Sequence, residues 1–331
     1  MHKLKIMAKL KKLFIFIILS NSSFAQNQTT DTIVMVSPEA FRYNEQTALT
    51  NSFQHNSSKN SNKAVLKEFN GMVTKLKKEN IDILVLQNRK GVETPDAVFP
   101  NNWFSVFSQE NNHNLLVLYP MLNNNRQLER QADNLKELLG QNDIKIDTTL
   151  DLTDYEKRNL ALEGTGSLVL DREHKFAFAS LSPRASEEVL RDFTKKIGYQ
   201  YLVFNSLDLN GKAIYHTNVV MSIGKSFAVL CSECIKDSNE KNIVLSKLKE
   251  LGKDIIEISA KQTTKMAGNI LEVQDKQGKS KTVMSMTAYK AFTPTQKAKI
   301  KQSSQIIVVD IPTIERIGGG SARCMMAEIF H

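Results

Sequence analysis

The chain has 331 residues, 41% of them hydrophobic and 24% charged, which is ample apolar content for the core of one large domain or two small ones. Its formal net charge of +9 falls to +4 when the five lysines of residues 1–25, a segment without an acid or an arginine, are set aside. The remaining balance gives no specific support for nucleic-acid binding, and no segment after residue 25 is apolar for long enough to span a bilayer.

Residues 1–25 have the layout of a secretory signal peptide. The lysines precede an apolar run at 13–19, and Ser23 and Ala25 supply small residues at positions −3 and −1 of a cleavage site. The run is too short for a membrane span, so we predict cleavage and a periplasmic or secreted protein that no longer contacts the membrane. An uncleaved anchor is the alternative. Residues 26–32 would then form a short polar leader.

Beyond this leader, runs typical of strands alternate with stretches that have an apolar face at helical spacing. The predicted strands are 33–37, 81–86, 115–119, 167–170, 175–180, 201–204, 219–223, 227–230 and 305–309. The predicted helices are 64–79, 128–139, 187–197 and 239–251. Helix 64–79 places Val65, Phe69, Met72, Val73 and Leu76 on one face. The polar segment 54–62 is predicted to be an exposed loop.

No linker rich in Pro, Gly or Ser interrupts this alternation, so we predict a single α/β domain over residues 33–331. Alternating strands and helices also fit a doubly wound sheet. However, the glycine fingerprint of a dinucleotide site is missing after the first strand, and the glycine run at 318–320 lies at the wrong end of the chain for that role.

Three cysteines leave at least one free thiol. Cys231 and Cys234 form a C-x-x-C pair after the strand at 227–230. They are either bridged, as suits an exported protein, or two half-buried small residues. A zinc site would need a second pair of ligands at similar spacing, which the sequence lacks, so no metal site is predicted.

The third cysteine, Cys324, follows a glycine run in the sequence GGGSARC at 318–324. We predict a short helix over 322–330 with the thiol in its first turn. Unpaired backbone N–H groups and the positive end of the helix dipole favour thiolate over thiol there, and the thiolate is the reactive form. The alternative is a buried structural cysteine in a C-terminal tail.

Three further side chains are candidates for catalysis or binding. His216, in YHTNVVM at 215–221, can take and return a proton near neutral pH, or is a structural histidine. Glu163, in LEGTGS, lies beside two glycines that allow close backbone approach, or is an exposed turn acid. Asp96, in PDAVFPNNWF at 95–104, belongs to a loop that mixes an acid, amides and aromatic rings, or forms a structural Asx turn.

The order Asp96, Glu163, His216 and Cys324, each in its own motif, resembles the arginine deiminase and amidinotransferase (pentein) superfamily. Within it, the chain is most similar to the citrulline-utilisation hydrolase, citrullinase-like branch. Further matching segments are FRYNEQTA at 41–48, Asn51 with Phe53-Gln54, and the run NNWFS that begins at Asn101. The resemblance spans roughly residues 35–330 and implies an α/β fold, a five-bladed α/β propeller of ββαβ-type units around a central substrate pocket.

The resemblance also implies a reaction on a small ureido or guanidino amino acid, without a metal or an organic cofactor. Cys324 would attack the central carbon of the ureido or guanidinium group. His216 would protonate the departing nitrogen and then take a proton from the hydrolytic water. Glu163 would hydrogen-bond the substrate's nitrogens and orient His216. Asp96 would accept hydrogen bonds from the terminal nitrogens, and Asn101 would also contact the substrate.

Two arginines extend the comparison. Arg126, in RQLE, and Arg184, in SPRAS, resemble family positions that hold the substrate's α-carboxylate. Arginine suits this role because its planar guanidinium can meet a carboxylate with two hydrogen bonds. Ser37, where many relatives have a basic residue, indicates a different pocket entrance.

One departure from the family bears on the substrate. Deiminases that act on arginine usually carry an aspartate two residues after the catalytic histidine, where this chain has Asn218. An amide is less complementary to a cationic guanidinium, and its N–H can meet the carbonyl oxygen of a neutral ureido group. We therefore predict hydrolysis of citrulline to ornithine, ammonia and carbon dioxide. The alternatives are an arginine or methylarginine deiminase-type hydrolase, or a non-catalytic binding protein of the same fold.

Overall fold

The structure is a computed structural model that describes residues 26–56 and 62–331. The predicted signal peptide, residues 1–25, lies outside the described residues, as does segment 57–61 of the predicted loop 54–62. Gln54, at the start of that loop, is buried rather than exposed, because its side-chain amide donates to the backbone oxygen of Gly318 at 3.0 Å.

The described strands form one six-stranded sheet and three three-stranded sheets. They divide into five triplets with one pattern, in which the first strand pairs antiparallel with the second and the second pairs parallel with the third. The triplets are β15 (Ala327–Ile329), β1 (Thr32–Val36) and β2 (Asp82–Leu86); β3 (Phe104–Gln109), β4 (His113–Leu118) and β5 (Thr148–Asp151); β6 (Val169–Asp171), β7 (Phe176–Ser180) and β8 (Gln200–Phe204); β9 (Met221–Ile223), β10 (Phe227–Leu230) and β11 (Asp254–Glu257); and β12 (Leu271–Gln274), β13 (Ser280–Ser285) and β14 (Gln305–Val309).

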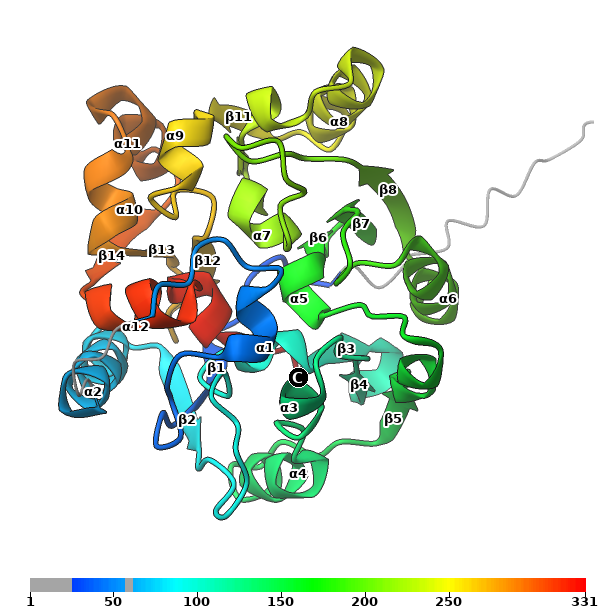
Figure 1. Ribbon diagram of the computed structural model, residues 1–331, viewed down its shortest axis with the longest axis vertical. Coiled ribbons are helices and arrows are strands. Elements are labelled where there is room, and N and C mark those ends of the chain that lie inside the picture. The colour runs from blue at the N-terminus through cyan, green and yellow to red at the C-terminus, as the bar shows by residue number, and fades with distance from the viewer. Residues whose placement is uncertain (1–25, 57–61) are drawn as a thin grey trace, which may run out of the picture.

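A longer helix connects the second and third strands of each triplet, since a parallel pair needs a crossover connection. These outer helices are α2 (Asn62–Lys78), α4 (Ala132–Gly140), α6 (Glu187–Ile197), α8 (Ser238–Glu250), and α10 (Met286–Ala291) with α11 (Pro294–Lys301). Figure 1 shows them around the rim of the molecule. The predicted face of α2 is confirmed: Val65, Phe69, Met72 and Leu76 are buried against β1 and its neighbours, and Val73 is partly buried.

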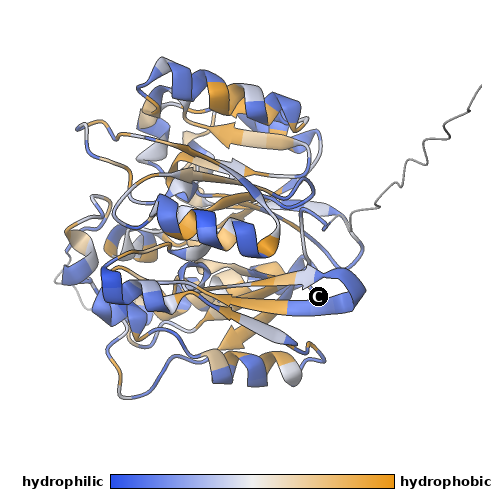
Figure 2. Ribbon diagram, turned by 90° about the vertical axis from the view of Figure 1, so that its right-hand side faces the viewer, coloured by the Kyte–Doolittle hydropathy of each residue, from blue (hydrophilic) through white to orange (hydrophobic). Residues whose placement is uncertain are grey.

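Most of the first and second strands of the triplets are buried, as in the five buried residues TIVMV of β1. The third strands β5, β8 and β11 are partly exposed. Figure 2 shows this distribution, with hydrophobic strands inside and helices that turn hydrophilic residues outward. The predicted α/β class is therefore confirmed. The triplets are not five separate sheets, however, because β15 also pairs in parallel with β3, at Ile329 and Val106.

The C-terminal segment differs from its prediction as a helix over 322–330. A 3-10 helix, η5 (Ala322–Met325), is followed by strand β15. This strand pairs antiparallel with β1 on one side and parallel with β3 on the other, so its backbone groups find partners in the sheet. The last strand of the chain thereby joins the first triplet to the second.

Three other predicted elements have different boundaries in the structure. Predicted strands 167–170 and 219–223 begin as short helices, α5 (Gly164–Ser167) and α7 (Thr217–Val220), and continue as β6 and β9. Predicted helix 128–139 begins later, at Ala132, and a separate short helix, α3 (Asn124–Gln127), precedes it. Three other short helices, α1 (Glu45–Ala48), α9 (Ala260–Thr263) and α12 (Pro312–Gly318), complete the α-helices of the described residues.

Candidate active site

A short turn or a short helix precedes the first strand of each of the five triplets. These segments, here called the central turns, are η1 (Pro100–Asn102) before β3, α5 before β6, α7 before β9, the turn at 266–269 before β12, and η5 before β15. Figure 1 shows α5 and α7 near the centre, inside the rim of outer helices. Contacts join α5 to η1 and α7, and η1 to η5. The repeated strand pattern thus gathers residues that lie far apart in the sequence.

Two glycines allow the central turns to pack this closely. A Cβ atom on Gly166 would lie 2.3 Å from Asn102 Nδ2 and 2.8 Å from the ring of His216. Gly164 has a φ of +43°, and a Cβ atom there would lie 2.3 Å from the backbone oxygen of Asn101. The prediction that the glycines beside Glu163 permit close backbone approach is confirmed.

His216 and Glu163 form a buried pair, with 2.8 Å between His216 Nε2 and Glu163 Oε2. Burial lowers the pKa of His216 to about 4, although the carboxylate acts in the opposite direction. Burial alone would raise the pKa of Glu163, but Arg184, His216 and Arg126 together hold that pKa well below its usual range. At neutral pH the pair is a carboxylate and a neutral imidazole. Nε2–H then donates to the carboxylate, and Nδ1 is left as the proton acceptor.

Arg126 and Arg184 both lie near Glu163, with guanidinium nitrogens 3.6 and 3.5 Å from Oε2. Arg126 also donates two 2.9 Å hydrogen bonds to Glu129 and one of 2.8 Å to Asn102 Oδ1. Burial raises the pKa of Glu129 to about 7, even though Arg126 acts against this shift. Arg126 therefore has a carboxylate partner of its own, Glu129, which sequence reasoning did not identify.

Arg184 has a different set of partners. Apart from Glu163, they are neutral: the hydroxyl of Thr50 at 2.7 Å and the backbone oxygen of Thr47 at 3.0 Å. Its guanidinium carbon lies over the ring of Tyr215, 5.0 Å from the centroid. Of the two predicted arginines, Arg184 is the one whose neutral partners an anion can replace without leaving a carboxylate unpaired.

The sulfur of Cys324 is buried among amides. Asn269 Nδ2 donates to Sγ at 3.2 Å, and Asn218 Nδ2 lies 3.5 Å from it. Asn218 Nδ2 also donates to the backbone oxygen of Thr165, which connects the sulfur to α5. The structure thus brings Cys324 and Asn218 into contact, and Asn218 lies two residues after His216.

Sequence reasoning missed Asn269, although a signal for it exists. Asn269 follows Gly268 and lies two positions before the start of β12, much as polar side chains and glycines alternate at 163–166 before β6. A Cβ atom on Gly268 would lie 2.1 Å from the backbone oxygen of Val219, so this turn packs against α7. Asn269 Nδ2 also donates to the backbone oxygen of Asn218 at 3.2 Å.

Asp96 lies in the loop between β2 and η1 and is almost fully buried. Its Oδ2 accepts hydrogen bonds from Asn44 Nδ2 at 2.8 Å and Thr47 Oγ1 at 2.9 Å, while Oδ1 has no partner among the described residues. Burial raises the pKa of Asp96, against the effect of Arg126 and the two hydrogen bonds. Asn44 and Thr47 belong to the segment at 41–48 that carried part of the family resemblance.

Asn101 lies in η1 and faces α5. Its Nδ2 donates to Thr165 Oγ1 at 3.2 Å, and its Oδ1 has no described partner. The structure therefore places all eight predicted site residues around the central turns or in the loops that pack on them. Asp96 is connected to the other site residues, because Arg126 Nη2 lies 3.5 Å from its backbone oxygen.

Within residues 26–56 and 62–331, no group of three or more His, Cys, Asp or Glu side chains is arranged to hold a metal ion. In the same part of the chain, no helix is both long and apolar enough to cross a membrane. Cys231 and Cys234 form a disulfide, which decides between the two possibilities left open for this pair.

Comparison with known proteins agrees with this geometry. The sequence profile of the family described as "N,N dimethylarginine dimethylhydrolase, eukaryotic" matches residues 37–331. The chain belongs to this family and, with it, to the arginine deiminase and amidinotransferase (pentein) superfamily. The predicted class, a hydrolase that acts on a nonpeptide C–N bond, is confirmed by this membership. No curated protein sequence matches the chain.

Solved structures show the same fold at low sequence identity. The N-terminal domain of ArgZ, an arginine dihydrolase of the ornithine–ammonia cycle in cyanobacteria, has a TM-score of 0.70 and 17% identity over 91% of this chain and 98% of that chain. A variant of AgrE in complex with L-arginine has a TM-score of 0.69 and 19% identity, over 90% of this chain and 40% of that chain. A dimethylarginine dimethylaminohydrolase variant in an adduct with S-methyl-L-thiocitrulline has a TM-score of 0.62 and 15% identity, over 91% of this chain and 100% of that chain.

Proposed function

We propose that this protein hydrolyses a C–N bond of a small ureido or guanidino amino acid, with citrulline as the first candidate substrate. The observation that carries the proposal is the surroundings of the Cys324 sulfur. Its hydrogen-bonding partners are the amides of Asn218 and Asn269, and no described carboxylate takes their place. Amide donors suit the carbonyl oxygen of a neutral ureido group and the negative charge that develops on it during attack.

In the proposed reaction, Cys324 Sγ attacks the ureido carbon, and Nδ1 of His216 takes the thiol proton. The proton passes to the departing nitrogen as the C–N bond breaks, which leaves a carbonyl carbon bonded to sulfur. His216 then takes a proton from water, whose oxygen displaces the sulfur. Hydrolysis releases a carbamic acid that still carries the second nitrogen, and its remaining C–N bond breaks as carbon dioxide is lost. The products are then ornithine, ammonia and carbon dioxide. Glu163 holds the Nε2–H of His216 throughout and keeps Nδ1 free for proton transfer.

Binding of the amino-acid end is assigned to Arg184 in preference to Arg126. Arg184 donates to Thr50 and to the backbone of Thr47, and a substrate α-carboxylate can replace these neutral acceptors. Arg126 would instead have to leave Glu129 unpaired in a buried position, which is costly. Asp96 and Asn101 each retain a buried oxygen without a described partner, and these oxygens are the proposed acceptors for the substrate's N–H groups.

A guanidino substrate is the second candidate, and one observation favours it. Asp96 Oδ1 is a buried carboxylate oxygen without a described partner, which is a suitable acceptor for a cationic guanidinium. The matching family is described by its action on N,N-dimethylarginine, and ArgZ is an arginine dihydrolase. Attack by sulfur on a guanidinium carbon and on a ureido carbon is the same chemistry.

The two candidates are separated by a substrate panel. The purified protein is given citrulline, arginine and N,N-dimethylarginine in turn, and ornithine, citrulline and ammonia are quantified over time. Equal amounts of ornithine and ammonia from citrulline are the expected result. Conversion of arginine to citrulline, with citrulline itself left unchanged, would reverse the assignment. Tight binding of any of the three without product would favour the non-catalytic binding protein.

We also infer that residues 33–331 form one catalytic domain and that its five strand triplets are the blades of a propeller around the central turns. Export to the periplasm or the medium is supported by the disulfide between Cys231 and Cys234, since disulfides persist in oxidising compartments. Fractionation of cells that express the whole chain tests the location: recovery of the shortened chain with the periplasm is expected, and full-length chain in the cytoplasm would contradict export.

A further inference from the structure

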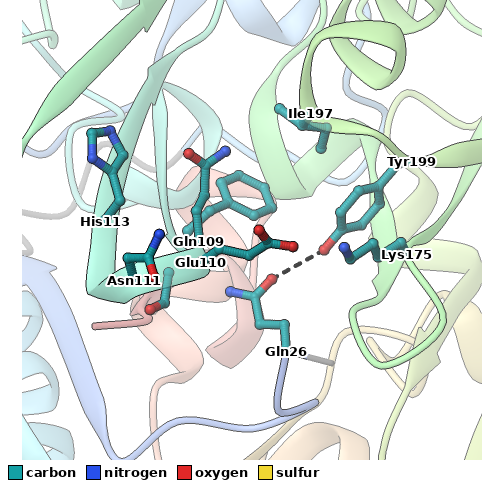
Figure 3. Close-up of a pocket in the computed structure, with 10 residues that line it drawn as sticks. Gln26, Gln109, Glu110, Asn111, His113, Lys175, Ile197 and Tyr199 are labelled. Carbon is teal, nitrogen blue, oxygen red and sulfur yellow. Dashed lines mark hydrogen bonds between the residues drawn. The ribbon is translucent and has the colours of Figure 1, made fainter. Parts of the chain in front are cut away.

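Gln26, the first described residue, is built into a pocket rather than left at the surface. Its side-chain oxygen accepts a hydrogen bond from the hydroxyl of Tyr199 at 3.1 Å, and the residue is 6% exposed. Its amide nitrogen, Nε2, is buried and has no described partner. Figure 3 shows the Gln26 amide among the residues that line this pocket, with a hydrogen bond to Tyr199 and with Glu110 and Lys175 nearby. The pocket has a volume of about 500 Å³.

The residues that follow Gln26 are fixed in place. Gln28 Nε2 donates to the backbone oxygen of Leu170 at 2.9 Å, and Gln28 Oε1 accepts from the backbone N–H of Arg172 at 2.7 Å. Thr30 Oγ1 donates to the backbone oxygen of Ile329 at 2.6 Å. The predicted polar leader is therefore anchored to the third triplet and to β15, which holds Gln26 beside Tyr199.

We propose that cleavage after Ala25 makes Gln26 the N-terminal residue and that its side chain then closes onto the new α-amine to form a neutral lactam, docked in this pocket. The proposal rests on the signal-peptide cleavage inferred above and goes beyond the hydrolase activity. It assigns a modification site to the mature N-terminus.

The reaction needs no co-reactant. The unprotonated α-nitrogen of Gln26 attacks its own side-chain carbon Cδ, a bond forms between these two atoms, and the bond from Cδ to Nε2 breaks. Nε2 leaves as ammonia, with one of its protons taken from the α-amine. A five-membered ring remains, whose carbonyl oxygen is the former Oε1. While the peptide bond to Ala25 is intact, no free amine exists and the ring cannot form.

The pocket fits the product better than the open side chain. Oε1 survives in the ring and can keep the hydrogen bond from Tyr199. The amide nitrogen that lacks a described partner is the atom that leaves, so a buried unsatisfied donor group is removed. Ring closure also removes the positive charge of an α-ammonium group, which would otherwise have to give up water to enter a pocket whose own charges, Lys175 and Glu110, are one of each sign.

The test uses the whole chain, residues 1–331, exported by a Gram-negative host and purified from the periplasm. Intact mass and tandem mass spectrometry of the first peptide are expected to show a chain that begins at residue 26 and is lighter by one ammonia than the open glutamine form. Edman degradation should give no sequence. The control, Gln26→Ala, should be cleaved at the same bond, give a readable N-terminus and keep its hydrolase activity.

Docking of the ring is tested with pyroglutamyl aminopeptidase. The enzyme should release the ring from denatured protein and only slowly, at least tenfold slower, from native protein. Tyr199→Phe, which removes the hydrogen bond to the ring oxygen, should make release from the native protein several-fold faster. An open Gln26 amine that persists after incubation at pH 8, or a mature chain that starts at another residue, would overturn the proposal. Equal release rates from native and denatured wild-type protein would overturn the docking.

Discussion

The side-chain amide of Asn269 donates a hydrogen bond of 3.2 Å to the sulfur of Cys324, although the two residues lie 55 positions apart and precede different strand triplets. The same amide donates to the backbone oxygen of Asn218, whose own amide lies 3.5 Å from the sulfur. Three central turns therefore meet at one atom. Both amides hold the sulfur in a fixed direction.

Replacement of Asn269 by alanine should lower kcat/KM by about 10–100-fold, because one buried hydrogen bond to the reacting sulfur is lost and a single donor of this kind is worth ~1.5–3 kcal/mol. Steady-state kinetics with the best substrate of the panel provide the measurement. Asn142→Ala is the matched control: this exposed asparagine follows α4, its side chain bonds only to Leu138 O of that helix, and its loss should leave kinetics unchanged. Equal kinetics for the two variants would contradict a role for Asn269 at the sulfur.

Cys324→Ser should lower turnover by about 10⁴-fold or more while the fold is retained, since a serine hydroxyl is a far weaker nucleophile than a thiol at neutral pH. A small haloamidine should label wild-type protein once per chain and should not label the variant, because Cys231 and Cys234 are joined in a disulfide. Substrate should protect Cys324 from the label. If Cys324→Ser kept a circular dichroism spectrum like that of wild type and turned substrate over at near the wild-type rate, Cys324 would not be the nucleophile.

How far the sequence predicts this molecule can be judged from particular elements. The apolar face of α2 and the buried run of β1 follow from local periodicity and are found as predicted. Strand β15 was expected to be helical, because its short sequence AEI carries little periodic signal, and its conformation is decided by pairing with β1 and β3. The closing contact of the fold is thus a long-range one that no local pattern contains.

The site shows the same division. Cys324, His216 and Glu163 have side chains with distinctive chemistry in recognisable motifs, and the structure gathers them around the central turns. Asn269 and Glu129 have no such mark, because one asparagine or glutamate among many becomes significant only through its partner. The hydrogen bonds that identify both residues exist only in the folded chain.

Gly166→Ala should damage both stability and activity. The added methyl group would lie 2.3 Å from Asn102 Nδ2 and 2.8 Å from the His216 ring, so the central turns must move apart, at a cost of about 1–3 kcal/mol. Gly71→Ala in α2 is the control, since nothing lies within 4 Å of a Cβ atom there and alanine in a helix should stabilise by ~0.5–1 kcal/mol. Thermal unfolding and kinetics measure both effects. A Gly166→Ala protein as stable and active as wild type would show that the turns are not closely packed.

Acid should destabilise the fold through His216. Its pKa is 6.5 in the unfolded chain and about 4 in the folded one, so the unfolded state binds the extra proton first. The contribution of His216 to the free energy of unfolding is complete above pH 6.5 and declines as the pH falls towards 4, by about 3 kcal/mol in total. Denaturant unfolding at a series of pH values measures the decline.

Glu129 changes the free energy of unfolding in the opposite direction over the same pH range, so its effect must be distinguished from that of His216. Its pKa is raised from 4.5 to about 7, so its contribution is complete below 4.5 and is lost as the pH rises through 7. The informative quantity is therefore the difference in free energy of unfolding between wild type and His216→Gln, because the contribution of Glu129 is common to both proteins and cancels. The variant should lose less stability than wild type between pH 6.5 and 4. Parallel curves for the two proteins would show that His216 titrates normally in the folded state.

Asn218→Asp should shift substrate preference from citrulline towards arginine. The change removes an N–H donor beside Cys324 Sγ and places a carboxylate there, which repels a developing negative charge on a ureido oxygen and attracts a guanidinium. The ratio of kcat/KM for arginine over citrulline should rise by about tenfold or more, since one charged contact distinguishes the two substrates.

Asn218→Ala separates the two parts of that effect. It removes the donor without adding charge, so kcat/KM should fall for citrulline and arginine alike and their ratio should change little. If alanine moved the ratio as far as aspartate does, the charge at this position would not select the substrate, and the argument for citrulline from Asn218 would fail. If neither variant altered the ratio, discrimination would have to come from another carboxylate, and Asp96, whose Oδ1 has no described partner, would be the next position to change.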